Sequence, residues 1–403
     1  MTVRNVLAVF GTRPEAIKMA PIVLAMRNQP DLRPVVVVTG QHRAMLDQVL
    51  DLFDIKPDFD LNIGRDRQTL SDTVSRALTG LANLMFEKPD LVMVQGDTAT
   101  TFAAALAAFF HRVPVVHVEA GLRTGDITSP YPEEMNRLLT TRLTALHLAA
   151  TPSSVRNLLA EGVPPDSIVC TGNSVIDALL TTLETPMTRE VTMLAELGRH
   201  RGPVLLVTTH RRESWGAPMA AVGRAIVRLA AAEPELLIVV PMHLNPVVRD
   251  VLRPMLAPIP NVMITDPLDY EVFCRVMQRS DVILTDSGGV QEEGPSLGKP
   301  VLVLRDTTER PEAVEAGTAR LVGTDEDRVV ESVLTLLRDP LEYEAMAKAV
   351  NPYGDGQAAE RAVTAIRYYF GDGPRPAEFL PAMVSAEAGE PDFYNGSVLP
   401  EYV

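Results

Sequence analysis

The feature that most constrains this chain is a repeated alternation of short apolar, β-branched runs with longer segments of helical periodicity. In the first half, segments such as Ala16–Met26 and Thr100–Phe110 have the helical pattern. The apolar runs between such segments are Val6–Phe10, Val35–Thr39, Leu91–Gln95, Val115–Val118 and Ile168–Cys170. Nearly continuous apolar strands that alternate with helices predict a parallel sheet covered by helices on both faces.

The same pattern starts again after Asn173. Its runs are Val204–Thr208, Leu236–Val240, Val262–Ile264, Val282–Thr285 and Val301–Leu304. Because single cores rarely grow past about 250–300 residues, we predict two doubly wound, Rossmann-like α/β domains, at 1–172 and 173–356. Two such sheets predict a ligand cleft where the carboxyl ends of their strands face each other.

The last part of the chain is assigned separately. We expect a late helix at about 357–370 to return and pack on the first domain. The stretch 371–403 holds six acids and one arginine and is rich in proline and glycine. This composition predicts an extended acidic tail outside either core.

Charge and cysteine content narrow the class of protein. A net charge of −15 argues against a nucleic acid or an anionic membrane as partner. No apolar run approaches the roughly 20 residues that a membrane span needs, and the first residues lack a signal-peptide layout. The only cysteines, Cys170 and Cys274, predict neither a disulfide framework nor a thiolate metal site. We therefore expect a cytoplasmic protein that needs no metal or redox cofactor.

A turn at 11–18 follows the first predicted strand. Gly11 permits a tight turn and Pro14 suits a first helical position, so Arg13 and Lys18 would lie at a helix N-terminus that binds an anion. An exposed turn with two solvated charges explains the same residues equally well. The chain has no Gly-x-Gly-x-x-Gly here and no Walker lysine, so neither NAD binding nor ATP hydrolysis is indicated.

Carboxylates also follow predicted strands. Asp97 and Glu119 end neighbouring strands and would point into one cleft, although a helix N-cap explains Asp97 as well. Glu133 and Glu134 lie in a proline-stiffened loop, which would hold a base or simply start a helix. His117 shares a strand face with Glu119, but without a cysteine pair we interpret it as a packed core histidine rather than a zinc ligand.

Two segments of the second half suggest phosphate binding. His210 and the arginines after it follow a buried strand, which favours an anion clamp over an ordinary charged surface. Asp286-Ser287-Gly288-Gly289 lies between a strand and a helix, where two glycines let the backbone approach a diphosphate closely. Glu293 would then accept ribose hydroxyls, and Arg310 would close the same pocket. A plain strand-to-helix turn explains the glycines but not the neighbouring acids.

Together these segments resemble the non-hydrolysing UDP-N-acetylglucosamine 2-epimerase family, from Phe10 to about Phe370. The resemblance rests on Gly-Thr-Arg-Pro-Glu at 11–15, Gly-Gln-His-Arg at 40–43, Gln-Gly-Asp-Thr at 95–98, His-Val-Glu-Ala-Gly-Leu-Arg-Thr at 117–124, Pro-Glu-Glu-Met-Asn-Arg at 132–137, His-Arg-Arg-Glu-Ser at 210–214 and Asp-Ser-Gly-Gly at 286–289. It implies a glycosyltransferase-B-like fold, a homodimer, and interconversion of UDP-N-acetylglucosamine with UDP-N-acetylmannosamine through elimination and re-addition of UDP.

The resemblance also implies roles for single residues. Asp97, Glu119 and Glu133 match the acid/base groups that inversion of a sugar carbon needs on both faces of the ring, without an assignment of each to a face. His210 matches a histidine near the leaving phosphate. The matching substrate-binding positions are Arg13, Lys18, Ser287, Gly288, Gly289, Glu293 and Arg310, with Phe273 at the uracil.

Departures from the family pattern leave some points open. Leu268 stands where members often have a glutamine near the uracil. Gln41, Arg67, Arg211 and His243 match a second, activating substrate site, but Ala44 replaces a glutamine there, which leaves substrate activation open. A hydrolysing epimerase that releases N-acetylmannosamine and UDP, a retaining glycosyltransferase of the same fold and a non-catalytic nucleotide-sugar sensor remain alternatives.

Overall fold

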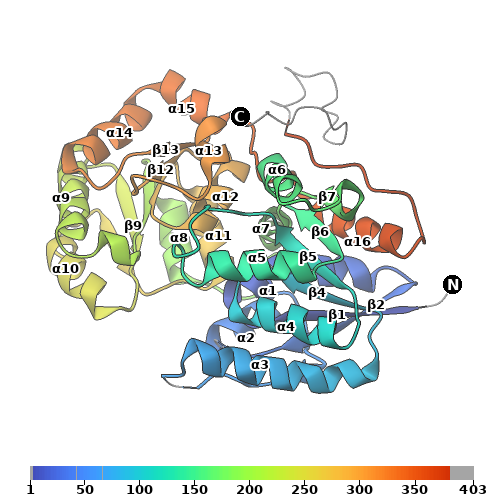
Figure 1. Cartoon of the computed structure of the whole chain (residues 1–403). Helices are drawn as coiled ribbons and strands as arrows, with labels where there is room; N and C mark the ends of the chain where they lie inside the picture. Colours follow the sequence, from blue (N-terminus) through green and yellow to red (C-terminus); the bar gives the residue numbers. More distant parts are fainter. Residues whose placement is uncertain (1–2, 42, 66, 382–403) are drawn as a thin grey trace, which may run out of the picture.

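The computed structural model describes residues 3–41, 43–65 and 67–381, and within them the chain forms two parallel β-sheets (Figure 1). The first sheet has the strand order β3-β2-β1-β4-β5-β6-β7, with every pair parallel. Its strands are β1 (Arg4–Phe10), β2 (Leu32–Val38), β3 (Phe59–Asp60), β4 (Leu91–Gln95), β5 (Val115–Ala120), β6 (Leu146–Ala149) and β7 (Ile168–Cys170).

The second sheet has the order β10-β9-β8-β11-β12-β13 and is also parallel throughout. Its strands are β8 (Val204–Thr208), β9 (Leu237–Pro241), β10 (Val262–Thr265), β11 (Val282–Thr285), β12 (Val301–Val303) and β13 (Ala319–Leu321). The predicted fold, two doubly wound sheets, is confirmed. The strand order reverses between β1 and β4 and again between β8 and β11, and such switch points are where open α/β sheets bind ligands.

Helices cover both faces of each sheet (Figure 1). They are α1 (Arg13–Arg27), α2 (Arg43–Leu52), α3 (Leu70–Leu84), α4 (Ala99–Phe110), α5 (Glu133–Leu143), α6 (Pro152–Ala160), α7 (Ser174–Glu184), α8 (Thr192–Arg199), α9 (Ala217–Ala232), α10 (Pro246–Leu256), α11 (Tyr270–Arg279), α12 (Gly288–Ser296), α13 (Pro311–Glu315), α14 (Glu326–Arg338), α15 (Pro340–Ala347) and α16 (Ala358–Tyr369). A short 3-10 helix, η1 (Met85–Glu87), follows α3. No helix of the described residues combines the length and apolar character that crossing a bilayer requires.

One continuous apolar core joins the two sheets. Phe10 of β1 and Leu206 of β8 belong to the same buried cluster, which also contains side chains of α1, α7, α11 and α16. Helix α7 packs on α1 as well as on α11 and α12, so it lies between the two sheets. The two domains are therefore joined by packed side chains as well as by the chain itself.

The late helix α16 packs against α1 and α7. Buried Asp177 of α7 accepts hydrogen bonds from the backbone N–H groups of Ala358 (3.2 Å) and Ala359 (2.8 Å), the first residues of α16. Arg367 near its end donates to Asp31 at 2.9 Å. These contacts fix the end of the fold to the first domain.

The segment after α16 differs from our expectation of a tail outside either core. The Phe379 N–H donates to the Cys170 carbonyl at 2.8 Å, and the Phe379 side chain is buried against β7 and α6. An apolar side chain here shields the open edge of β7, which would otherwise expose unpaired backbone groups. The rest of the predicted tail, 382–403, lies outside the described residues.

Candidate active site

Two adjoining cavities lie in the cleft between the sheets. The larger, of about 480 Å³, is lined from both domains by Arg13, Ile17, His210, Arg211, His243, Leu268, Tyr270, Phe273, Ser287, Gly288, Gly289 and Glu293. The smaller, of about 200 Å³, is lined mainly from the first domain by Thr12, Glu15, Gln95, Asp97, Thr98, Glu119, Leu122 and Arg137. Pro14, Lys18 and Arg310 line both cavities, so two cations mark the junction.

The junction cations belong to a buried ion-pair network. The Lys18 ammonium donates to Glu119 and lies 3.5 Å from Glu292 Oε2, while Arg310 Nε donates to Glu292 Oε1 at 2.8 Å. Burial by itself lowers the pKa of Lys18, but the carboxylates of Glu119 and Glu292 outweigh it and raise that pKa. Both cations therefore stay charged where an anion would bind.

Glu119 comes from an irregular end of β5. Its backbone has φ 61°, in the left-handed region, and the pairing of β5 with β6 shifts register between Val118 and Ala120. Such a bulge re-aims a side chain at the end of a strand. The Glu119 carboxylate accepts hydrogen bonds from Gln95, Lys18 and, at 3.3 Å, Asn173.

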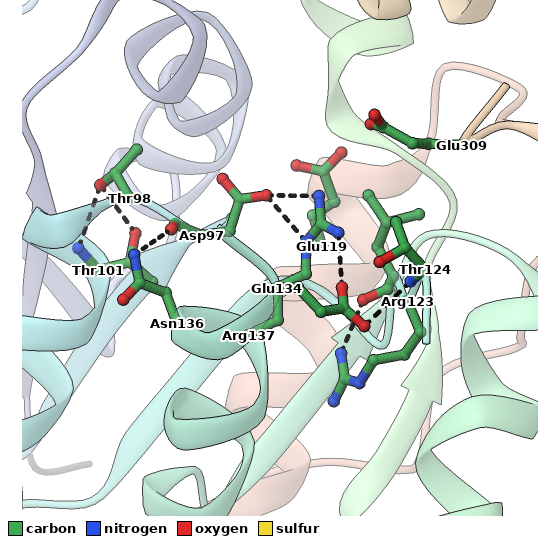
Figure 2. A network of polar contacts seen from close by, with 12 residues as sticks. Asp97, Thr98, Thr101, Glu119, Arg123, Thr124, Glu134, Asn136, Arg137 and Glu309 are labelled. Carbon is green, nitrogen blue, oxygen red and sulfur yellow. Dashed lines mark hydrogen bonds and ion pairs between the residues drawn. The ribbon is translucent and has the colours of Figure 1, made fainter. Parts of the chain in front are cut away.

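Asp97 follows β4 and is held from α5 (Figure 2). Arg137 donates to Asp97 Oδ2 through Nε at 2.9 Å and lies 2.8 Å from the same oxygen through Nη2. Asn136 donates to the Asp97 carbonyl at 2.8 Å. The N-cap of α4 is the next residue, Thr98, whose hydroxyl accepts from Thr101 N–H. The N-cap alternative for Asp97 is therefore wrong, and its carboxylate faces the smaller cavity.

The two adjacent acids at the start of α5, Glu133 and Glu134, differ in burial and in hydrogen bonding. Glu134 is buried, with one oxygen accepting from Thr124 N–H (3.0 Å) and Gly125 N–H (3.1 Å) and the other from Arg137 (2.9 Å). Glu133 is half-buried and is absent from the described residues that line either cavity. In the sequence, residues 121–132 separate Glu133 from the end of β5.

His210 follows β8 and lines the larger cavity from the second domain. Its Nδ1 is 3.2 Å from Asp286 Oδ1, and its backbone N–H donates to Asp286 Oδ2 at 2.8 Å. The His210 ring stacks on His243, with centroids 5.8 Å apart. Burial lowers the pKa of His210; the Asp286 carboxylate opposes this shift, and Arg211 and His243 add to it. An anion placed beside the ring would favour its protonated form.

The glycine turn completes the second-domain wall. Ser287 precedes α12, and Gly288 and Gly289 are its first residues. All three line the larger cavity at a helix N-terminus, a position that favours an anion. Buried Glu293, one turn later, accepts from the Tyr270 hydroxyl at 2.7 Å. Burial raises the pKa of Glu293 to about 7, although the Tyr270 hydrogen bond lowers it.

Comparison with known proteins places this chain in a family. The family model described as UDP-N-acetylglucosamine 2-epimerase matches residues 24–367. The UDP-N-acetylglucosamine 2-epimerase of Bacillus subtilis is 52% identical over 368 residues, covering 91% of this chain and 96% of that protein. The chain belongs to the UDP-N-acetylglucosamine 2-epimerase family.

Solved structures of epimerases agree with this assignment. A putative UDP-N-acetylglucosamine 2-epimerase from Listeria monocytogenes has a TM-score of 0.88 at 45% identity and covers 94% of this chain and all (100%) of that chain. The UDP-GlcNAc 2-epimerase from Neisseria meningitidis, solved bound to UDP-GlcNAc, has a TM-score of 0.83 at 47% identity, covering 90% of this chain and 100% of its own. The predicted resemblance is confirmed.

The four residues that we expected at a second substrate site do not all line the same cavity. Arg211 and His243 line the larger cavity. Gln41 lies outside both cavity linings of the described residues, with its side-chain oxygen 3.5 Å from the Thr100 hydroxyl, and Arg67 is exposed. His42 of the same motif, and the side chain of Ala44, lie outside the described part of the chain.

Sequence reasoning missed several residues that build this epimerase site. They are Glu15, Gln95, Arg137, Asn173, Asp286 and Glu292. Buried Glu15 accepts from the Gly11 and Thr12 N–H groups and from the Thr98 and Thr101 hydroxyls, so it ties the loop after β1 to the loop after β4. Most of these residues lie inside or beside the motifs quoted above, so the motifs themselves could have pointed to them. His117, by contrast, matches our interpretation as a core histidine, since it is buried and bonds the Gly96 carbonyl at 2.7 Å.

Proposed function

We propose that this chain interconverts UDP-N-acetylglucosamine and UDP-N-acetylmannosamine without releasing free sugar. The observation that carries the proposal is the position of Lys18 and Arg310 at the junction of the two cavities. A nucleotide sugar changes from nucleotide to sugar at its diphosphate. With the diphosphate at the junction, the uridine occupies the larger cavity and the sugar occupies the smaller one, beside Asp97 and Glu119.

The charges at the junction suit cleavage of the bond between the sugar and UDP. When the C1–O bond breaks, negative charge develops on the leaving diphosphate, and Lys18, Arg310 and the backbone at the start of α12 offset it. His210 supplies a further positive charge once the diphosphate favours its protonated form. The carbon left behind is oxocarbenium-like, which makes the hydrogen on sugar carbon 2 acidic.

Carboxylates then complete the inversion. One removes the hydrogen of carbon 2, giving 2-acetamidoglucal and UDP held together in the cleft. A proton is then delivered to carbon 2 on the other face while UDP adds back at carbon 1. Asp97 and Glu119 are the proposed groups within the smaller cavity, and Glu133 would join them if its loop moves toward the substrate.

The remaining parts of the proposal concern assembly and compartment. Two copies pair through the first domain, where Phe86, Phe109 and Phe110 expose 72, 58 and 64% of their surface around the end of α4. Exposed apolar patches of this kind mark interaction sites. The free thiols of Cys170 and Cys274, both buried, suit the reducing cytoplasm.

One experiment tests the reaction against its alternatives. The chain is incubated with UDP-N-acetylglucosamine alone in deuterium oxide, and the products are followed by NMR. We expect UDP-N-acetylmannosamine, with deuterium at carbon 2 of both epimers. Free N-acetylmannosamine would indicate a hydrolase, and unchanged substrate a sensor or a transferase that lacks its acceptor. Epimers with unlabelled carbon 2 after many turnovers would rule out the elimination route.

A further inference from the structure

The geometry points to Arg137 as the positioning residue of the reaction, which holds Asp97 by one carboxylate oxygen and leaves the other for the substrate. This inference rests on the proposed function and adds a residue to it. Arg137 lies on α5, four residues after Glu133, and lines the smaller cavity. Figure 2 shows it between Asp97 and Glu134.

Arg137 contacts only one of the two carboxylate oxygens of Asp97. Nε and Nη2 both approach Asp97 Oδ2, at 2.9 and 2.8 Å, instead of spanning the two carboxylate oxygens. Among the described residues, Oδ1 of Asp97 receives no hydrogen bond. The Asp97 side chain keeps 26% of its surface exposed, whereas Arg137 keeps 5%. The two guanidinium nitrogens thus hold Oδ2 in place, while Oδ1 receives no hydrogen bond from the described residues and is left for the substrate.

A second carboxylate fixes Arg137 in turn. Nη1 donates to Glu134 Oε2 at 2.9 Å, and the other oxygen of Glu134 accepts from the backbone of Thr124 and Gly125. Glu134 keeps only 2% of its side chain exposed. The buried guanidinium is therefore balanced by two carboxylates, and its planar fork has little freedom to rotate.

Arg137 and Glu134 together join two loops of the site to the start of α5. Asp97 lies in the loop after β4, Thr124 and Gly125 lie after β5, and Glu134 adjoins Glu133 at the start of α5. Removing the guanidinium would release Asp97 from its orientation without touching the larger cavity, whose lining does not include Arg137. Loss of a positioning contact should therefore reduce turnover and spare UDP binding.

The test compares Arg137→Ala, Arg137→Lys and Glu134→Gln with Arg142→Ala. Arg142 is a control on the same helix, because its side chain is exposed and donates to the Glu161 carbonyl at 3.2 Å. We expect Arg137→Ala to lower kcat about a hundredfold, as misplacement of a reacting group does. KM for UDP-N-acetylglucosamine and Kd for UDP should stay near wild-type values. Glu134→Gln should lose less, and Arg142→Ala nothing.

Chemical rescue separates positioning from a purely structural role. Guanidinium at millimolar concentration should restore kcat of Arg137→Ala saturably, whereas methylammonium, which carries the charge without the fork, should not. Wild-type kcat in Arg137→Ala, or a loss of kcat and UDP binding together without rescue, would overturn the inference.

Two further outcomes are decisive. If Arg137→Ala does not fold, Arg137→Lys carries the test, because it keeps the charge but cannot hold Asp97 and Glu134 together; unchanged kcat in that variant would overturn the inference. An inactive wild-type chain would instead overturn the proposed function itself, so the two failures are distinguishable.

Discussion

Glu119 has the least usual backbone among the residues that line the smaller cavity. A left-handed φ at a residue other than glycine costs about 1–3 kcal/mol, which the surrounding structure must supply. Here the bulged end of β5 and the hydrogen bonds from Gln95, Lys18 and Asn173 hold it. The result is a carboxylate aimed at the junction cations, a direction that a regular strand would not give.

Asp97 gives the most direct test at this scale. Asp97→Asn keeps the shape of the side chain but removes its basicity, so we expect kcat to fall about a hundredfold or more. Kd for UDP, measured by calorimetry, should change little because Asp97 is not part of the larger cavity. Asp327→Asn, at an exposed position of α14, serves as the control. Near wild-type epimerisation in Asp97→Asn would exclude Asp97 as an acid/base group.

We expect Glu293 to make UDP binding depend on pH. Burial raises its pKa to about 7, so below that pH the protonated carboxyl is a poorer acceptor for ribose hydroxyls. Kd for UDP should therefore rise as the pH falls below 7, by up to about tenfold per pH unit, and level off above it. Glu293→Gln, which cannot ionise, controls for the titration of UDP itself. Parallel pH profiles for the two proteins would show that Glu293 does not contact the nucleotide as a carboxylate.

Single residues also show where sequence reasoning ends. The position of Asp97 and Glu119 in one cavity follows from parallel strands that end at one sheet edge, and it was predicted. Glu133 and Glu134 could not be told apart, because neighbours on a helix differ by about 100° in direction and only the packed structure decides which one is buried.

The turn before α12 shows at the scale of one element why glycine is needed. A Cβ built on Gly288 would lie 2.7 Å from Nη1 of Arg310, which Glu292 holds in place. A Cβ on Gly289 would meet nothing closer than Glu293 at 3.6 Å. The first glycine thus makes room for the cation, and the second leaves space toward the cavity.

A pair of alanine variants tests this difference. Gly288→Ala should displace Arg310 and weaken UDP binding about tenfold, since overpacking a buried site costs about 1–3 kcal/mol. Gly289→Ala should lose less, and Gly198→Ala on α8, where the added Cβ meets no atom within 4 Å, should match the wild type. Kd values from calorimetry give the comparison. Equal losses in Gly288→Ala and Gly289→Ala would contradict the argument.

Other elements were predicted unevenly. The strands that carry the site were recognised because each is a run of buried β-branched residues. β3, β6 and β13 were missed: β3 has two residues, and β6 follows α5 after only Thr144 and Ala145, so its short apolar run has no clear turn before it. None of the three ends in a residue that lines either cavity.

For the whole molecule, the exposed phenylalanines predict a change of assembly. If Phe86, Phe109 and Phe110 form the contact between two copies, Phe109→Asp combined with Phe110→Asp should yield monomers in sedimentation velocity, because charges buried in an apolar interface are costly. Leu341→Asp, at a position 80% exposed on α15, should leave the assembly unchanged. A dimer that persists in the double variant would place the interface elsewhere.

The cleft between two facing sheets was predicted, but the contacts that join the sheets could not be read from the chain. Helix α7, which the pattern placed in the second domain, packs on α1 of the first, and the buried cluster continues through both. Polar contacts also cross the cleft: Lys18 approaches Glu292 at 3.5 Å, Thr151 donates to Glu312 at 2.9 Å and Arg13 donates to the Leu268 carbonyl at 3.5 Å. Such pairs join residues far apart in the sequence, so only the folded chain reveals them.

Glu292 links the two domains electrostatically, because it pairs with Lys18 of the first domain and Arg310 of the second. Without ligand it is the anion shared by Lys18 and Arg310. Glu292→Gln should let the two cations repel each other, so the ligand-free protein should open and show a larger radius of gyration in small-angle scattering. UDP places its phosphates between the same cations and should return the variant to the compact form. The wild-type protein should contract less than Glu292→Gln on binding UDP, because Glu292 already holds the two domains together. Glu331→Gln, on the exposed face of α14, is the control and should behave like the wild type. Superimposable profiles of ligand-free Glu292→Gln and wild type would mean that the apolar contacts around α7 hold the domains without this charge.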